Sequence, residues 1–178
     1  MKIKSMVLGP FGTNCYIIEK DGKALIIDPA DEKNTIIKSV GDKEVVGIIV
    51  THYHPDHIGA LIDVKNYYKV KVYDIKNLKE GNNNIENFKF EVIYTKGHTE
   101  DLITIYFKEE KKMFCGDFIF AGSIGRWDLE GGNFDTMKES IRKILKYPSD
   151  ITIYPGHGPT TTLGREIYTL NYFLSLNY

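Results

Sequence analysis

The sequence predicts an α/β fold in which two β-sheets are covered by helices. The chain has 178 residues, a length that suits one domain, and we expect that domain to span residues 1–178. Short apolar runs rich in β-branched residues fall into two groups along the chain, and segments with helical periodicity follow each group. No repeat, linker or low-complexity stretch separates the groups. Two sheets, each with one face under helices, are the natural packing for such a chain.

The first group of strands occupies the N-terminal part of the chain. Asp21 and Gly22 form a typical hairpin turn between two apolar runs. Asp31 is suited to cap a short helix that carries Ile36 and Val40. We expect strands at residues 2–8, 14–19, 24–28 and 45–52, and after Asp56 a helix with Ile58, Leu61 and Ile62 on one face.

The second group contains a long glycine-rich connection. Residues 118–133 include four glycines and are expected to form a loop, and a loop of this length in a compact domain is usually functional. Residues 134–146 place Met137 and Ile141 on the apolar face of a core helix that Pro148 ends. The other expected elements are strands at 70–73, 88–95, 102–107, 112–116 and 151–154 and a last helix carrying Leu163, Ile167, Leu170 and Leu174.

Composition and charge argue against several classes of function. Lys and Arg number 23 against 24 Asp and Glu, so the net charge is −1 and no basic stripe offers a nucleic-acid surface. No segment is long enough to span a bilayer, and the apolar run near the N-terminus is too short for a signal peptide. Cys15 and Cys115 lie in apolar surroundings, which favours two buried thiols over a disulfide. We therefore expect a cytoplasmic protein without a nucleic-acid or membrane partner.

Three of the five histidines fall within the stretch THYHPDHIGA, where His52, His54 and His57 accompany Asp56. A helix would separate positions i and i+2 by about 200°, whereas an extended segment points them the same way. A strand that ends at Thr51 would therefore direct His52 and His54 to one side. We expect Pro55 to delay the helix that follows, so that Asp56 occupies its N-cap. The pattern predicts four metal ligands at one strand-to-helix turn.

The remaining histidines repeat this arrangement. His98 and His157, and also Asp117, each follow an apolar strand-like run and lie next to a glycine. A single loop histidine is more often a surface residue than a ligand. That reading does not account for five histidines that all lie at strand ends, where ligand sites form in open α/β folds. We therefore predict one metal site at one edge of the molecule.

These motifs resemble the metallo-β-lactamase superfamily. The resemblance rests on H-x-H-x-D-H at 52–57, GH at 97–98, GD at 116–117 and GHG at 156–158, and it covers nearly the whole chain. It implies a four-layer αββα sandwich and two divalent metal ions, most simply zinc, with iron or manganese as alternatives. It also implies a ligand set: His52, His54 and His98 on one metal, Asp56, His57 and His157 on the other, and Asp117 bridging them.

Within this superfamily, residues 120–132 (FAGSIGRWDLEGG) resemble short bacterial hydrolases similar to glyoxalase II. That likeness implies hydrolysis of a small hydroxyacyl thioester by a hydroxide that bridges the metals, with Asp56 and Asp117 as catalytic residues. Asp28 is expected to hydrogen-bond a ligand imidazole or simply to end its strand. Tyr53, Arg126 and Trp127 are candidates to bind the substrate, although each also fits a packing role, and Arg126 fits an ion pair with Asp128.

Two features depart from the family pattern. Glu100 and Asp101 follow the GHT motif where Pro-Gly is usual, and they are interpreted as solvated loop acids. Only one helix is expected after GHG, whereas glyoxalase II carries a helical C-terminal domain that binds glutathione, so the thiol carrier stays open. The acyl group, the physiological metal and the oligomeric state also stay open.

Other reactions of the superfamily remain as alternatives. A mononuclear iron oxidoreductase similar to persulfide dioxygenases is disfavoured by the intact GHG, because those enzymes lack a histidine at the position of His157. A lactonase would show the same ligands. A β-lactamase is disfavoured because Asp117 stands where those enzymes use Cys or no bridging carboxylate, and a tRNA-type phosphodiesterase is disfavoured by the near-neutral charge.

Overall fold

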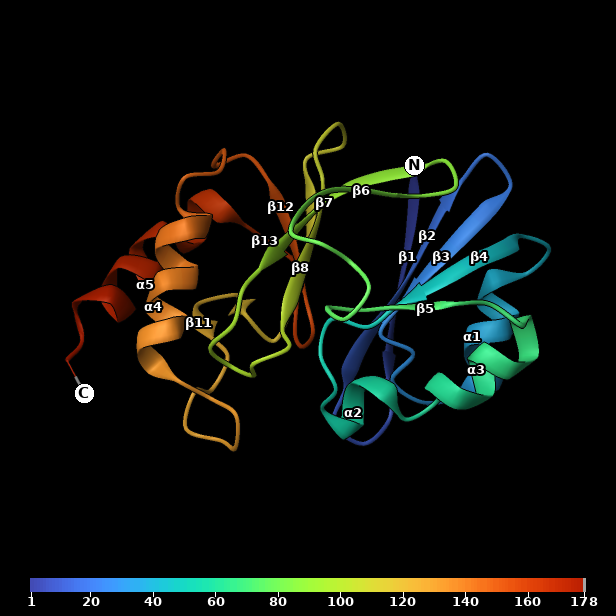
Figure 1. The fold of residues 1–178 in the computed structure, drawn as a ribbon, viewed down its shortest axis with the longest axis horizontal. Helices are drawn as coiled ribbons and strands as arrows, with labels where there is room; N and C mark the ends of the chain where they lie inside the picture. Colours follow the sequence, from blue (N-terminus) through green and yellow to red (C-terminus); the bar gives the residue numbers. More distant parts are fainter. Residues whose placement is uncertain (178) are drawn as a thin grey trace.

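Two β-sheets stack face to face, and helices cover the outer face of each, in the computed structural model of the chain, which describes residues 1–177 (Figure 1). Helices α4 and α5 lie outside one sheet, and α1 and α3 lie outside the other. The expected four-layer αββα sandwich is confirmed. The helices are α1 Lys33–Val40, α2 Pro55–Ile58, α3 Leu61–Tyr68, α4 Phe134–Ile144 and α5 Leu163–Ser175. Within residues 1–177 no helix has the length and apolarity needed to cross a lipid bilayer.

The N-terminal sheet has the strand order β1-β2-β3-β4-β5. Its first three strands form antiparallel pairs, and β4 and β5 then run parallel to β3. Because Ile27 and Ile49 are register partners, the segments that follow β3 and β4 leave the same edge of the sheet. The strands are β1 Lys2–Leu8, β2 Thr13–Lys20, β3 Lys23–Ile27, β4 Glu44–Ile49 and β5 Val72–Tyr73.

The C-terminal sheet has the strand order β13-β12-β9-β8-β7-β6. Strand β12 runs parallel to β9, and Pro155 is the register partner of Gly116, so the turns after both strands lie side by side. The neighbouring pairs are antiparallel. The strands are β6 Gly81–Ile85, β7 Phe88–Tyr94, β8 Ile103–Phe107, β9 Lys112–Gly116, β12 Thr152–Pro155 and β13 Thr161–Thr162, and a separate hairpin is formed by β10 Ile119–Phe120 and β11 Ser123–Ile124.

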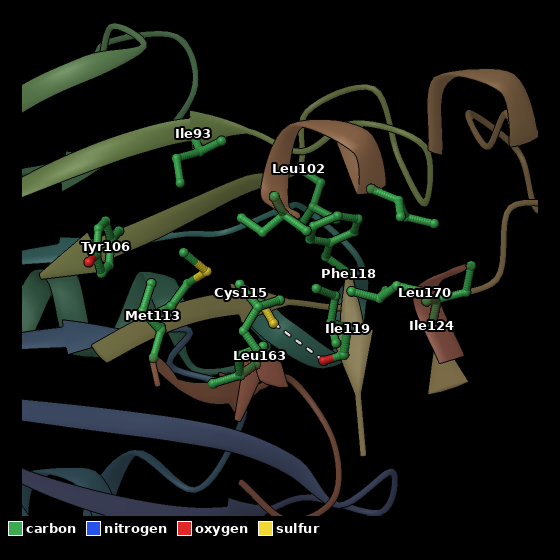
Figure 2. Packing of buried hydrophobic residues seen from close by; sticks show 14 of the residues in the cluster. Ile93, Leu102, Tyr106, Met113, Cys115, Phe118, Ile119, Ile124, Leu163 and Leu170 are labelled. Atoms are coloured by element: carbon green, nitrogen blue, oxygen red, sulfur yellow. Dashed lines mark hydrogen bonds between the residues drawn. The ribbon is translucent and has the colours of Figure 1, made fainter. Parts of the chain in front are cut away.

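Three apolar clusters hold the four layers together: one lies between the sheets, and one lies under each pair of helices. The cluster beneath α4 and α5 contains Met113, Cys115, Phe118 and Ile119 (Figure 2). The Cys115 thiol lies 3.3 Å from the Ile119 carbonyl oxygen, and burial raises the pKa of this thiol to about 12. Cys15 is also free and fully buried, so the expectation of two buried thiols is confirmed.

Three strand regions differ from the sequence-based expectation, and one of them is the two-residue strand β13, which was not expected. Strand β6 was not expected, because its sequence GNNNI is rich in Asn, a residue depleted in strands. It is tolerated at the edge of the sheet, where only one side pairs. Residues 118–133 were expected to be a loop without strands, but they contain the β10–β11 hairpin. Four residues of this hairpin are too few to give a periodic pattern.

The starts of two helices and the exposure of two helix residues also differ from the sequence-based expectation. Glu32, and not Asp31, is the N-cap of α1. Strand β4 ends at Ile49 rather than at Thr51, and Pro55 begins α2 with His54 as the N-cap, so the expected N-cap role of Asp56 is wrong. Proline is favoured at the first helical position because its φ is preset and its missing N–H would have no partner there. Ile62 and Ile167 were expected on apolar faces but are 64% and 40% exposed.

Candidate metal centre

The turns after four strands meet at one edge where the two sheets face each other. The segment after β4 carries His52 to His57, and β9 and β12 lead directly to Asp117 and His157. His98 follows β7 in the turn before β8. The structure thus brings together the seven side chains that the sequence singled out. Six of them form two groups, which we name the first donor trio (His52, His54 and His98) and the second donor trio (Asp56, His57 and His157), and Asp117 is the seventh.

The first donor trio consists of three imidazoles whose inward nitrogens nearly touch. His54 Nδ1 lies 3.2 Å from His52 Nε2 and 2.9 Å from His98 Nε2. Two nitrogens bound to one zinc ion at ~2.0–2.1 Å and at the tetrahedral angle would be about 3.3 Å apart. His52 and His98 are buried, and His54 is half-buried. The spacing of the first donor trio therefore fits a single cation.

The second donor trio combines one carboxylate with two imidazoles. Asp56 Oδ2 lies 3.1 Å from His157 Nε2 and 3.6 Å from His57 Nε2. Thr13 donates a hydrogen bond of 2.8 Å to the same Asp56 oxygen. His57 is fully buried, whereas the side chain of His157 is 30% exposed. This arrangement offers a second cation a donor set that is open on one side.

Asp117 lies between the two donor trios. Its Oδ1 is 3.2 Å from His57 Nε2, and its Oδ2 is 3.6 Å from His98 Nε2 and 3.5 Å from His157 Nε2. Gly156 makes this position accessible, because a Cβ there would lie 2.1 Å from Asp117 Oδ1. The neighbouring Gly116 adopts a φ of +51°, and a Cβ there would lie 2.5 Å from the Thr51 hydroxyl oxygen. A side chain at Gly156 would displace the carboxylate, and one at Gly116 would collide with Thr51.

Two buried atoms of this cluster have no hydrogen-bond partner among the described residues. They are His57 Nε2 and Asp117 Oδ1, which face each other outside hydrogen-bond geometry. Buried polar atoms without partners are costly and rare in folded proteins. Imidazole nitrogens and carboxylate oxygens are also the donors that zinc, iron and manganese accept. The residues present therefore fit a pair of divalent cations on both geometric and chemical grounds.

A network of hydrogen bonds behind the imidazoles fixes their orientation. Asp28 Oδ2 lies 2.9 Å from His57 Nδ1, and the two Asp28 oxygens accept bonds from the amide and the hydroxyl of Thr51 at 2.7 and 2.6 Å. His98 Nδ1 lies 2.6 Å from the Arg126 carbonyl oxygen. Each contact leaves the opposite ring nitrogen directed at the cluster. Outer partners of this kind orient metal-binding imidazoles in many proteins.

The local electrostatics differ between the imidazoles. Burial, reinforced by the nearby His57, holds the pKa of His52 well below its usual range. Burial likewise lowers the pKa of His54, with a further contribution from His98. For His57, burial disfavours the charged form, but the carboxylates of Asp117 and Asp28 outweigh it and raise its pKa to about 10. His52 and His54 are thus held in the neutral form that binds a cation, while His57 is paired with carboxylates.

Two residues that join the two sheets beside the cluster were not predicted from the sequence. Asn14 is buried on β2, and its side-chain amide donates to the carbonyls of Pro155 and Gly158 at 3.0 and 2.9 Å. Tyr16 donates to the Pro155 carbonyl at 2.5 Å. The segment that carries His157 is therefore held against the other sheet. The unusual polarity of Thr-Asn at the start of an apolar strand was the only available signal.

The three candidate substrate residues lie in different surroundings. Tyr53 is 37% exposed, and its hydroxyl donates to the buried Asp74. Arg126 is exposed and forms a two-point ion pair with Asp128, at 2.9 Å for both bonds. Trp127 packs against Phe134 and Phe173, with ring centroids 4.5 and 5.9 Å apart, and joins the edge of the core beneath α4 and α5. A role of these three residues in substrate binding remains a prediction.

A four-layer sandwich whose edge gathers imidazoles and carboxylates defines a class of metal-binding α/β proteins. The chain also matches the sequence profile of the Metallo-beta-lactamase superfamily over residues 8–81 and 74–157. It belongs to the metallo-β-lactamase superfamily, as the motifs predict.

Relatives and solved structures agree with this assignment over almost the full chain. The chain is 32% identical to a probable metallo-hydrolase, YqgX, of Bacillus subtilis, over 93% of this chain and 94% of that protein. It is also 32% identical to the hydroxyacylglutathione hydrolase GloC of Haemophilus influenzae, over 93% of this chain and 95% of that protein. Among solved structures, the BLEG-1 B3 metallo-beta-lactamase superposes with a TM-score of 0.92 at 31% identity, covering 98% of this chain and 100% of that one. TTHA1623 in a di-iron-bound form superposes with a TM-score of 0.84 at 28% identity, covering 92% and 96%.

Proposed function

We propose that the chain is a hydrolase that uses two divalent cations to cleave a small thioester, such as a hydroxyacyl thioester. The two donor trios would each hold one cation, and Asp117 would contact both. Bound in this way, the cations would lower the pKa of a shared water towards ~7 and polarise the scissile carbonyl. The observation that carries the proposal is the convergence of seven donors in which the buried atoms His57 Nε2 and Asp117 Oδ1 lie 3.2 Å apart and have no hydrogen-bond partner among the described residues.

The donor set supports two cations rather than one. A mononuclear iron oxidoreductase needs only one complete group of ligands, whereas His157 and Asp56 complete a second group here. His157 is held in place by the contacts of Asn14 with the Pro155 and Gly158 carbonyls. The structural neighbour with two bound irons is consistent with this count.

The chemistry of the leaving group favours a thioester. A thiolate has a pKa near ~8–9 and can depart without a strong general acid. All five histidines lie in the donor trios, and the Tyr53 hydroxyl already donates to Asp74, so neither supplies a free proton donor. An amide or phosphodiester leaving group would need such a donor. The likeness to a hydroxyacylglutathione hydrolase points to the same class of substrate.

β-Lactam hydrolysis is the second candidate, because a solved structure described as a B3 metallo-beta-lactamase superposes over nearly the whole chain. The Asp117 carboxylate between the donor trios argues for the thioester instead. A lactone presents the same kind of carbonyl to the same donors, so it belongs among the substrates to be compared. The metal is zinc in the simplest case, although the same mixed donor set accepts iron or manganese.

A substrate panel tests the proposal directly. Metal analysis of the purified protein should give close to two ions per chain. The protein reconstituted separately with Zn²⁺, Fe²⁺ and Mn²⁺ is then assayed against hydroxyacyl thioesters of glutathione and of smaller thiols, a lactone, a β-lactam and a phosphodiester. We expect the highest kcat/KM for a thioester. A single tightly held iron with oxygen uptake, or a higher kcat/KM for the β-lactam, would contradict the proposal.

A further inference from the structure

Two hydrogen bonds flank His52 and connect it to the segment that follows His98. On one side, the backbone N–H of Tyr53 donates to Asp101 Oδ2 at 3.0 Å. On the other side, the backbone N–H of Ile103 donates to the Thr51 carbonyl at 3.0 Å. The first bond depends on the side chain of Asp101, which was expected to be a solvated loop acid; it lies at the surface of the turn and also accepts this bond.

These two bonds join the two sheets at the first donor trio. His52 and His54 lie on the segment that leaves the N-terminal sheet, whereas His98 and Asp101 lie in the turn between β7 and β8 of the other sheet. The inward nitrogens of His54 and His98 are only 2.9 Å apart, so a small shift of one segment against the other would change the spacing of the trio. The Asp101 contact limits that shift.

A second contact fixes the same segment from its outer side. The hydroxyl of Tyr53 donates to Asp74 Oδ2 at 2.5 Å, and Asp74 is only 6% exposed. Asp74 in turn accepts a bond from the backbone N–H of Lys76 at 2.8 Å, which holds its carboxylate in the loop after β5. The residue between the two ligands His52 and His54 is therefore anchored at both its backbone and its side chain.

We propose that Asp101 is a positioning residue that sets the cation affinity of the first donor trio through the backbone of Tyr53. The inference rests on the two-cation site of the proposed function. It assigns no such role to the second donor trio, whose His157 segment is held by Asn14 and whose His57 is held by Asp28. Loss of the Asp101 carboxylate therefore weakens one of the two cation sites selectively.

The test compares Zn²⁺ affinity, measured by competition with a chromophoric chelator, among three variants. Asp101→Ala removes the acceptor, and we expect about 10- to 100-fold weaker binding at one site, the usual cost of losing an outer partner of a ligand. Asp101→Asn keeps an acceptor oxygen and should restore most of the affinity. Glu100→Ala is the matched control, because it removes a neighbouring acid that is exposed in the same turn. Its affinities should equal those of the wild type.

Two further variants, each with one donor trio disabled, identify the cation site that Asp101→Ala weakens. In His157→Ala the second donor trio is disabled, and adding Asp101→Ala should weaken the remaining Zn²⁺ site by the same factor. In His98→Ala the first donor trio is disabled, and adding Asp101→Ala should leave the remaining site unchanged. The midpoint of thermal unfolding of the metal-free Asp101→Ala protein should stay close to that of the wild type, because the contact lies at the surface.

Each remaining outcome overturns the inference. Equal weakening of both sites, or unfolding of Asp101→Ala without metal, would show a general structural role. Weakening by Asp101→Asn as large as that by Asp101→Ala would show that charge, and not the hydrogen bond, matters. If the wild type binds no Zn²⁺, the proposed function itself fails, whereas two wild-type sites that are insensitive to Asp101→Ala refute only the positioning role.

Discussion

The two donor trios use the same side-chain chemistry but are supported in different ways. Both trios draw on both sheets, but the first donor trio is all imidazole, and its outer contacts are the Arg126 carbonyl, the Thr51 hydroxyl and the Asp101–Tyr53 bond. The second donor trio includes a carboxylate, and its His57 rests on the fully enclosed Asp28. One trio is held mainly by the position of two chain segments, and the other is held by a buried ion pair.

This difference has consequences for charge and for rigidity. A cation at the second donor trio would meet the Asp56 carboxylate as well as Asp117, whereas a cation at the first donor trio would meet only Asp117 as a formal negative charge. The more exposed His157 leaves the second trio open towards solvent. We therefore expect the two cations to differ in affinity, and variants that act on one trio make this difference measurable.

The largest effect is expected from Asp117, which both donor trios share. Asp117→Ala removes the carboxylate between them, and we expect thioester hydrolysis to fall by more than about 100-fold, beyond the cost of losing an outer partner. The metal content should also fall below two ions per chain. Steady-state kinetics and elemental analysis provide the measurements. Undiminished hydrolysis by this variant would remove Asp117 from the site.

An intermediate effect is expected from Asp28, which contacts His57 of the second donor trio directly and Thr51 beside His52. Asp28→Ala leaves His57 Nδ1 and both donors of Thr51 without their acceptor. Buried groups left unpaired in this way should lower the free energy of unfolding of the metal-free protein by about 3 kcal/mol. Urea unfolding measures this change. Asp28→Asn keeps an acceptor and the backbone φ of +49°, which Asn tolerates, so a comparable loss in that variant would contradict the explanation.

The smallest effect is expected from the ion pair beside the first donor trio. Arg126 and Asp128 are exposed, and pairs of this kind contribute little to stability. Asp128→Ala should leave the urea midpoint unchanged within error and kcat/KM within about twofold of the wild type. The backbone carbonyl of Arg126 would still accept the hydrogen bond from His98 Nδ1. A fall in KM for a thioester with an anionic thiol carrier would instead show that Arg126 binds the substrate once it no longer pairs with Asp128.

The sequence was sufficient to locate the donors because their positions follow a local rule. His52, His98, Asp117 and His157 each follow an apolar run beside a glycine or at a strand end, and strand ends converge in this class of fold. The same reasoning predicted the ends of most strands to within one or two residues, because a continuous run of β-branched residues favours a strand over other secondary structures. The two-sheet architecture followed from the grouping of these runs.

The supporting contacts could not be predicted in the same way. Asn14 bonds to carbonyls more than 140 residues away, and Asp101 bonds to the backbone of Tyr53. Side-chain bonds to distant backbone groups leave no periodic signal in the sequence. Strand β6 was missed because edge position overrides residue propensity, and the start of α2 was missed because Pro55 begins the helix rather than delaying it. Local rules thus found the ligands, while tertiary contacts decide how they are held.

The order of the donors along the chain has a consequence for biosynthesis. Four of the seven donors leave the ribosome together in residues 52–57, and the last, His157, follows one hundred residues later (157 − 57). A nascent chain can therefore offer an early cation only a partial set of ligands, all of them from one sheet. A complete set of ligands for cations exists only after the second half of the chain has been translated and has packed against the first half.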